Sequence, residues 1–360
     1  MHKNLKIYYV CELNLPSKSA YSIHVMKMCE AFSKIGFDLN LFTINHDQTS
    51  NLFRLYNVKY KFKIKSIFKN RINFNLFFRI LFTLKILFKN IDKDSIFISR
   101  SIIFALIASA LKKKVVLELH HEISGFSKLL YFFLASLNLI NDLKYIFLHK
   151  NLNKIYKIKK KKIFLDDGVD INNFKFKKKI KYINTCVYIG SFFEGKGVEI
   201  IYKVAKLNKK INFHLYGDKN FLQNKKIPEN VKIFDHVSYK KIPKILSLYK
   251  VALMPYQNKV KGRNSSVWLE NYMSPLKMFD YLAAKMIIIA SDLKIYKHIL
   301  KNKFNCKLAP VDDPHYWNKI IQESFKNNLQ NNKITINAYK TVKKYTWENR
   351  CKKIIKFINT

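Results

Sequence analysis

Short runs of β-branched and aromatic residues alternate with longer stretches of helical periodicity along the first half of the chain. An amphipathic stretch at 22–35 predicts a helix, and Gly36 ends it, because glycine readily takes the positive φ of a helix C-terminus. The expected strands lie at residues 5–10, 38–44, 95–99, 114–119, 144–148 and 162–165. This alternation is typical of a parallel sheet with helices on both faces.

The same alternation starts again after a polar segment at 175–181. A first strand is expected at 184–190, followed by a glycine-containing turn and an amphipathic helix that ends near Leu207. Further buried strands are expected at residues 211–217, 231–237, 250–255 and 286–292. The second half of the chain therefore predicts a second parallel sheet.

Two sheets of this kind predict an α/β fold with two facing Rossmann-like domains. We expect an N-terminal domain at 1–175 and a C-terminal domain at 182–330. A helical tail at 331–360 is expected to pack back across the junction, toward the N-terminal domain. A ligand is expected beyond the carboxyl ends of the strands, where α/β folds place their binding sites.

The composition narrows the class of protein. The 360 residues are 49% hydrophobic, which excludes a disordered chain, and the five cysteines show no metal-binding or disulfide spacing. No apolar run is long enough to span a membrane, so a cytoplasmic protein is expected. The net charge of +43 is spread evenly over both halves and comes mainly from Lys, which indicates a biased composition and no nucleic-acid partner.

One basic segment departs from this even spread. Residues 48–91 contain no acidic residue, and their Lys and Arg are interleaved with Phe, Tyr, Ile and Leu. Within 75–89 a helix would gather Asn75, Arg79, Thr83, Lys85 and Lys89 on one face. Such a helix suits an anionic membrane surface, and a peripheral position on the inner face of the membrane would follow. The alternative is an ordinary helix with a solvated Lys face.

The segment SPLKMFDYLAA at 274–284 predicts an anion site. We expect Ser274 to cap a helix whose first residue is Pro275. The free N–H groups of that helix end attract an anion, and Lys277 adds a full charge in the first turn. Asp280 follows one turn later, where it can bind ribose hydroxyls. The alternative is a plain capped helix in which Lys277 pairs with Asp280.

Two further segments carry candidate chemistry. GSFFEGKG at 190–197 follows a strand and opens a helix without P-loop spacing, so Lys196 either reaches a diphosphate or lies in a plain turn. VVLELHHEISG at 115–125 places His120 and His121 at the carboxyl end of a strand. Because neighbouring side chains on extended chain point apart, we expect one of the two to face the ligand. A metal site is not expected.

These pieces resemble the GT-B glycosyltransferases, and specifically family 4. The similar segments run in family order over nearly the whole chain except 45–95, at residues 22–43, 118–122, 166–174, 187–201, 242–256 and 274–292. The resemblance implies that Lys196 and Lys277 hold the donor diphosphate, that Asp280 binds the ribose and that His120 lies beside the transferred sugar. The full donor-binding set that we predict is Lys196, Gly197, Ser274, Leu276, Lys277 and Asp280. The predicted catalytic set is His120, Lys196 and Asp280.

The sequence also departs from the family pattern. Ser191 stands where relatives commonly carry Arg, and Tyr272 stands where they carry the first of two glutamates. Lys261 and Arg263 are candidates to replace the lost charge.

The resemblance implies a retaining, metal-independent transferase that needs no cofactor besides its substrate, a UDP- or GDP-sugar. The acceptor would be a glycan or lipid-linked saccharide in cell-surface polysaccharide synthesis. The alternatives are a sugar-nucleotide epimerase of the same fold and a degenerate basic scaffold that binds membranes or nucleic acid.

Overall fold

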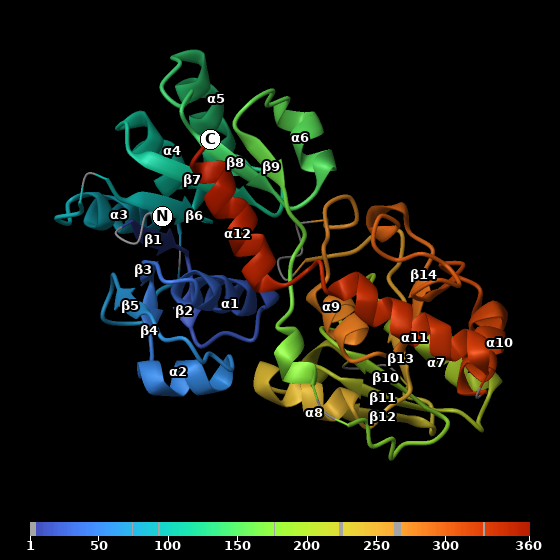
Figure 1. Cartoon of the computed structure of the whole chain (residues 1–360). Helices are drawn as coiled ribbons and strands as arrows, with labels where there is room; N and C mark the ends of the chain where they lie inside the picture. Colours follow the sequence, from blue (N-terminus) through green and yellow to red (C-terminus); the bar gives the residue numbers. More distant parts are fainter. Residues whose placement is uncertain are drawn as a thin grey trace. The chain divides into compact units, whose positions relative to one another are not determined.

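The computed structural model divides the chain into two compact units (Figure 1). Unit 1 comprises residues 1–166 and 347–360, and unit 2 comprises residues 167–346. The structure describes residues 5–73, 75–92, 94–175, 177–222, 226–262, 268–326 and 328–360. Among these residues, no helix combines the length and the apolar character that a membrane span needs.

Unit 1 is built on a seven-stranded parallel sheet in the order β5-β3-β1-β6-β7-β8-β9. The strands are β1 (Lys6–Val10), β3 (Asp38–Thr43), β5 (Lys63–Ser66), β6 (Ile96–Ser99), β7 (Lys114–Leu119), β8 (Lys144–Phe147) and β9 (Lys162–Phe164). A two-stranded ladder, β2 (Asn14–Leu15) with β4 (Asn45–His46), lies beside it. The strand order reverses between β1 and β6, and such a reversal leaves a crevice beyond the strand ends.

The helices of unit 1 form two layers. They are α1 (Ala20–Lys34), α2 (Thr49–Leu55), α3 (Leu76–Leu87), α4 (Ile102–Ala110), α5 (Gly125–Ser136), α6 (Lys150–Tyr156) and α12 (Trp347–Ile358). α1 packs against α12, whereas α3, α4 and α5 pack side by side. Right-handed crossovers leave β1 and β6 in opposite directions across the sheet, so α1 lies on one face and α4 with α5 on the other.

Unit 2 holds a six-stranded parallel sheet in the order β12-β11-β10-β13-β14-β15. The strands are β10 (Thr185–Ile189), β11 (Asn212–Tyr216), β12 (Val231–Phe234), β13 (Val251–Met254), β14 (Ile287–Ser291) and β15 (Lys307–Ala309). The helices are α7 (Val198–Leu207), α8 (Ile242–Leu246), α9 (Leu276–Ala283), α10 (Pro314–Phe325) and α11 (Leu329–Val342). Every residue of β10, β13 and β14 is buried, which explains their continuous apolar runs. The predicted class, α/β with two parallel-sheet domains, is confirmed.

The boundaries of the units differ from those expected at 175–182 and 331. The segment after Asp167 already belongs to unit 2, where Val169 pairs with Thr346 and the Lys179 N–H donates to the Ser247 carbonyl. Within the tail, α11 packs on α9 in unit 2, and α12 alone joins unit 1. The boundaries of the units are set by backbone pairing between residues that are distant in sequence. A shift in composition along the chain does not reveal such pairing.

The basic segment also folds differently from its helical wheel. Thr83 is buried, Arg79 pairs with Glu12 at 3.0 Å, and Asn75 caps α3. Thr83 and Arg79 therefore turn toward the domain and are not on a solvated face, whereas Asn75 at the helix start is exposed. Lys85 and Lys89 are exposed as expected.

Candidate functional site

The loop between β10 and α7 depends on glycine. Gly197 precedes α7 with φ of 86°, and a Cβ there would lie 1.8 Å from the Pro255 carbonyl oxygen. A Cβ at Gly190 would lie 2.5 Å from the Nζ of Lys277. Glycine therefore lets the loop approach β13 at one point and leaves room for a lysine ammonium at the other.

Helix α9 presents its N-terminus beside this loop. It begins at Leu276, with Pro275 in extended conformation at the cap position. The predicted cap by Ser274 is wrong, because the Pro275 backbone moves the helix start one residue onward. The Ser274 hydroxyl instead accepts a hydrogen bond from the Asp167 N–H at 3.1 Å, within unit 2. The first N–H groups of α9 thus gain no side-chain cap and stay available to an anion.

Lys277 carries its ammonium into the space left by Gly190. Its Nζ is buried, has no hydrogen-bond partner in the described part of the chain, and lies 3.7 Å from the centre of the Tyr188 ring. Burial, and then the nearby charge of Lys196, holds the pKa of Lys277 well below its usual value. The alternative in which Lys277 pairs with Asp280 is wrong, since no such contact forms.

Lys196 approaches the same place from the loop before α7. The Nζ of Lys196 lies 5.0 Å from the centre of the Tyr256 ring, and the Nζ of Lys277 lies 5.2 Å from the same ring centre. Burial lowers the pKa of Lys196 to about 8, and no carboxylate in the described residues offsets it. Two ammonium groups therefore lie near one tyrosine ring, an arrangement that costs free energy until an anion joins them.

Asp280 lies one turn beyond Lys277 and is 4% exposed. Burial raises the pKa of Asp280 to about 7, although the Tyr239 hydroxyl donates a hydrogen bond to its Oδ1 at 3.2 Å. At neutral pH this carboxyl group therefore exists in both protonation states. It can accept a hydrogen bond from a ligand hydroxyl or donate one.

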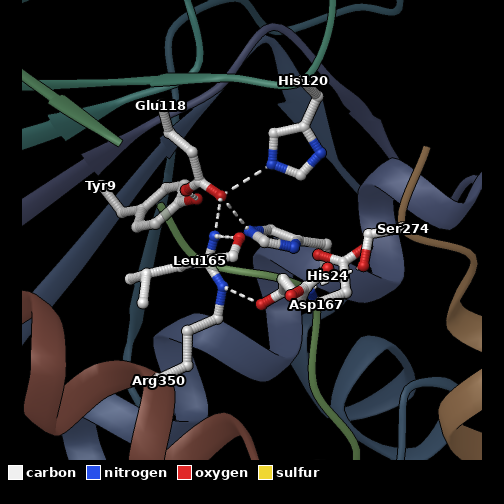
Figure 2. Close-up of polar contacts among 9 residues, drawn as sticks. Tyr9, His24, Glu118, His120, Leu165, Asp167, Ser274 and Arg350 are labelled. Atoms are coloured by element: carbon white, nitrogen blue, oxygen red, sulfur yellow. Dashed lines mark hydrogen bonds and ion pairs between the residues drawn. The ribbon is translucent and has the colours of Figure 1, made fainter. Parts of the chain in front are cut away.

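Unit 1 contains a second polar cluster, centred on the buried carboxylate of Glu118 at the end of β7 (Figure 2). Its Oε2 accepts from the Tyr9 hydroxyl at 2.8 Å, and its Oε1 accepts from the Arg350 guanidinium at 2.9 Å. His24 and His120 place Nε2 atoms at 2.8 and 2.7 Å from the same Oε1. Burial by itself would raise the pKa of Glu118, but His24 and Arg350 hold it well below the usual range.

The cluster fixes the chemical state of His120. Burial lowers the pKa of His120 to about 3, so the ring is neutral at pH 7. A carboxylate can only accept hydrogen bonds, so the Nε2 of His120 carries the ring proton and donates it in a hydrogen bond to Glu118. The Nδ1 of His120 therefore remains an acceptor. His121 is exposed, and its Nδ1 contacts the Glu122 carbonyl at 2.8 Å. Of the two neighbours, His120 is thus the positioned one.

His24, Glu118 and His120 bring three ligand atoms within 4.8 Å of one another, which is close enough for a metal ion. The surrounding charge opposes one, because the Arg350 guanidinium already binds the carboxylate oxygen that a cation would need. The donor set fits a hydrogen-bonded cluster better than a metal centre.

Three members of this cluster were missed in the sequence. Tyr9 and His24 lie inside apolar runs of β1 and α1 and look like core residues. Arg350 carried a usable signal, because it is one of six Arg in a chain that otherwise uses Lys. Its Nε also donates to the Asp166 carbonyl at 3.0 Å, a contact that Lys cannot reproduce together with the Glu118 pair.

The residues at the positions that depart from the family pattern contact other groups of the chain. The Ser191 carbonyl accepts from the Tyr188 hydroxyl at 2.7 Å, and Tyr272 is half-buried. Lys261 pairs with Glu194 and is not a free replacement for the missing arginine charge. Arg263, the other candidate, lies outside the described residues.

Residues 170–341 match the model of the family described as glycosyl transferases group 1. This segment covers almost all of unit 2, including both lysines and α9. No curated protein matches the sequence significantly.

Solved structures resemble the whole chain. A glycosyltransferase from Rickettsia africae aligns with a TM-score of 0.72 at 13% identity, over 99% of this chain and 98% of its own. HepE from Anabaena, solved with UDP and glucose, gives 0.71 at 12% identity over 99% and 100%. TarM from S. aureus, in a complex that includes UDP, gives 0.73 at 13% over 99% and 100%. The chain has the GT-B fold of these glycosyltransferases.

Proposed function

We propose that the protein is a retaining glycosyltransferase of family 4 that uses a nucleotide-sugar donor. The observation that carries the proposal is the buried ammonium of Lys277, which lies near Lys196 at the start of α9 and has no hydrogen-bond partner among the described residues. Two cations and a helix N-terminus together favour a diphosphate. The match of residues 170–341 to the glycosyl transferases group 1 supports the same assignment.

Unit 2 would hold the donor through its nucleoside diphosphate. Lys196 and Lys277 bind the phosphates, and the N–H groups at Gly197 and Leu276 donate to their oxygens. These groups stabilise the diphosphate as it leaves, which is where negative charge develops in the reaction. Asp280 binds the ribose hydroxyls. Ser274 acts indirectly, because its hydroxyl holds the chain at Asp167 and so fixes the loop before α9.

In unit 1, His120 binds a hydroxyl of the transferred sugar through its free Nδ1, as the resemblance implies. Glu118 and Arg350 are positioning residues, because they fix the orientation and tautomer of the His120 ring. The acceptor hydroxyl then attacks on the face from which the diphosphate departs, so the anomeric configuration is retained. No step needs a metal ion in this proposal.

The substrates are assigned by chemistry and by likeness. UDP occurs in the structures of HepE and TarM, which favours a UDP-sugar over a GDP-sugar. The acceptor is a glycan or lipid-linked saccharide of cell-surface polysaccharide synthesis. A cytoplasmic enzyme, peripheral on the inner face of the membrane, is part of the same proposal.

Thermal unfolding tests the donor site. The protein is heated with UDP, GDP, ADP, CDP or TDP, with and without EDTA, because a ligand that binds only the folded state raises the melting temperature. We expect one diphosphate to stabilise the protein, EDTA to change nothing, and Lys196→Ala to abolish the response. Lys206→Ala is the matched control, since Lys206 is an exposed lysine on α7. A response that survives Lys196→Ala would contradict the proposed site.

A further inference from the structure

The two helix layers of unit 1 differ in what they expose. Among the described residues of α1 and α12, no large apolar side chain is exposed. On α3 and α5, and on the residues that end them, nine such side chains are exposed. They are Leu76, Phe77, Leu84, Phe88, Phe126, Leu129, Phe132, Phe133 and Leu137. One domain therefore carries, on one side of its sheet, helices α1 and α12 without exposed large apolar side chains and, on the other side, helices that expose nine of them.

Helix α5 shows the pattern most clearly. Its buried side consists of Ser127, Tyr131 and Leu134, whereas Leu129 and Phe133 on the outer side are 72% and 60% exposed. A helix on the surface of a water-soluble domain has the opposite pattern, with its polar side turned outward. The outer face of α5 is thus built to contact something apolar.

Helix α3 repeats the arrangement. Phe77, Leu84 and Phe88 follow one another at helical spacings of seven and four, and they are 66%, 39% and 86% exposed. α4 packs against both α3 and α5, so the three helices form one continuous layer. Exposed apolar side chains gathered on two helices of one layer indicate an interaction site.

Exposed lysines accompany this surface without any carboxylate on the same helices. Residues 75–91, 95–117 and 123–141 contain no Asp or Glu. The exposed lysines in these ranges are Lys85, Lys89, Lys112, Lys113, Lys114 and Lys128, of which Lys114 pairs with Asp94. The partner must therefore offer both an apolar phase and negative charge.

We infer that the outer faces of α3 and α5, which we call the α3/α5 surface, dock into the interfacial zone of an anionic lipid membrane. The phenylalanine and leucine side chains enter the boundary between headgroups and acyl chains, and the lysines contact lipid phosphates. A second copy of this chain fits less well, because a pair of such surfaces would bring the lysines of both copies close to one another. The inference concerns unit 1 and does not depend on the donor site of unit 2.

Vesicle flotation tests the inference without any nucleotide. Purified protein is mixed with phosphatidylcholine vesicles that contain or lack phosphatidylglycerol, at low and high salt. We expect binding to the vesicles that contain phosphatidylglycerol, weakened by salt. The double substitution Leu129→Glu with Phe133→Glu should weaken this binding at least about tenfold, since it places two carboxylates in the apolar zone. Both side chains are exposed, so the unfolding temperature should not fall.

A control of equal charge separates position from net charge. Leu329→Glu with Ile336→Glu makes the same chemical change at two exposed positions, 79% and 53%, on α11 of unit 2. We expect this variant to bind vesicles as the unmodified protein does. Equal losses in the two variants would overturn the inference, as would unchanged binding of the α5 variant. It would also be overturned by self-association that the α5 substitutions abolish while no vesicle is bound.

Discussion

The buried ammonium of Lys277 leads to an unusual expectation for its replacement by methionine. Methionine fills nearly the same space against Tyr188 and carries no charge. Removing a buried polar group without a partner should raise the free energy of unfolding by about 1 to 3 kcal/mol. The cation–π contact over Tyr188, worth about 0.5 to 2 kcal/mol, is lost at the same time. The ligand-free Lys277→Met protein should therefore be as stable as the unmodified protein or about 1 kcal/mol more stable.

The same substitution should remove the response to a diphosphate. At a ligand concentration of about 100 times Kd, the unmodified protein gains about 2.7 kcal/mol, and a unit of this size then melts roughly 5 to 10 °C higher. We expect the melting temperature of Lys277→Met to stay within about 2 °C of its ligand-free value under the same conditions. Lys206→Met, at an exposed position of α7, is the control and should respond normally.

Calorimetry with and without the diphosphate measures both effects on one sample. The reasoning is refuted if Lys277→Met unfolds well below the unmodified protein and still responds to the ligand. That result would make the ammonium a structural group, stabilised by Tyr188, and would place the anion elsewhere.

Four further outcomes follow from the described contacts. The pKa of Lys196 is about 8 in the folded protein, so above that pH the lysine must take up a proton before it can bind an anion as an ammonium group. The rise in melting temperature that the diphosphate causes should therefore shrink between pH 8 and 10. The pKa of Asp280 is raised from 3.8 to about 7, so the folded state holds one extra proton between these values and stability falls as pH rises through this window. Denaturant titration should show that Asp280→Asn flattens this dependence, whereas an unchanged slope would assign it to other groups. Arg350→Met should cost about 3 to 5 kcal/mol in urea unfolding, because it removes the guanidinium from the buried Glu118 carboxylate, and adding Glu118→Gln should recover part of that loss. His120→Ala should abolish sugar transfer, measured as diphosphate release in the presence of acceptor, while the thermal response to the diphosphate persists; equal effects of His121→Ala would contradict the role given to His120.

The fold could be predicted from the sequence wherever burial dictates composition. Strands such as β13 and β14 are buried on both faces, so their apolar runs stand out from the alternating helices. Two edge strands, β5 and β15, could not be found in this way. β5 reads KIKS with half its residues exposed, and β15 has three residues, so neither differs in pattern from a loop.

The candidate site could be predicted in its residue types but only partly in its geometry. Lys277 and Asp280 stood out because a helix start with a lysine is a local pattern. That the two side chains do not pair with each other was not predictable. Asp280 accepts a hydrogen bond from Tyr239 and Lys277 lies over the Tyr188 ring, and both tyrosines come from elsewhere in unit 2. Arg350 and Glu118 are distant in sequence, and no local pattern links them.

The return of α12 to unit 1 sets the order in which the two units can be completed during synthesis. Unit 2 is continuous in sequence, so all of it has been made once residue 346 is added. Unit 1 lacks Arg350 until residue 350 is added, and until then the carboxylate of Glu118 lacks its guanidinium partner. Folding from the N-terminus onward is the ordinary order for a growing chain. Here we expect unit 2, which is synthesised later, to reach its final structure first, and unit 1 to complete its structure only after α12 has been synthesised.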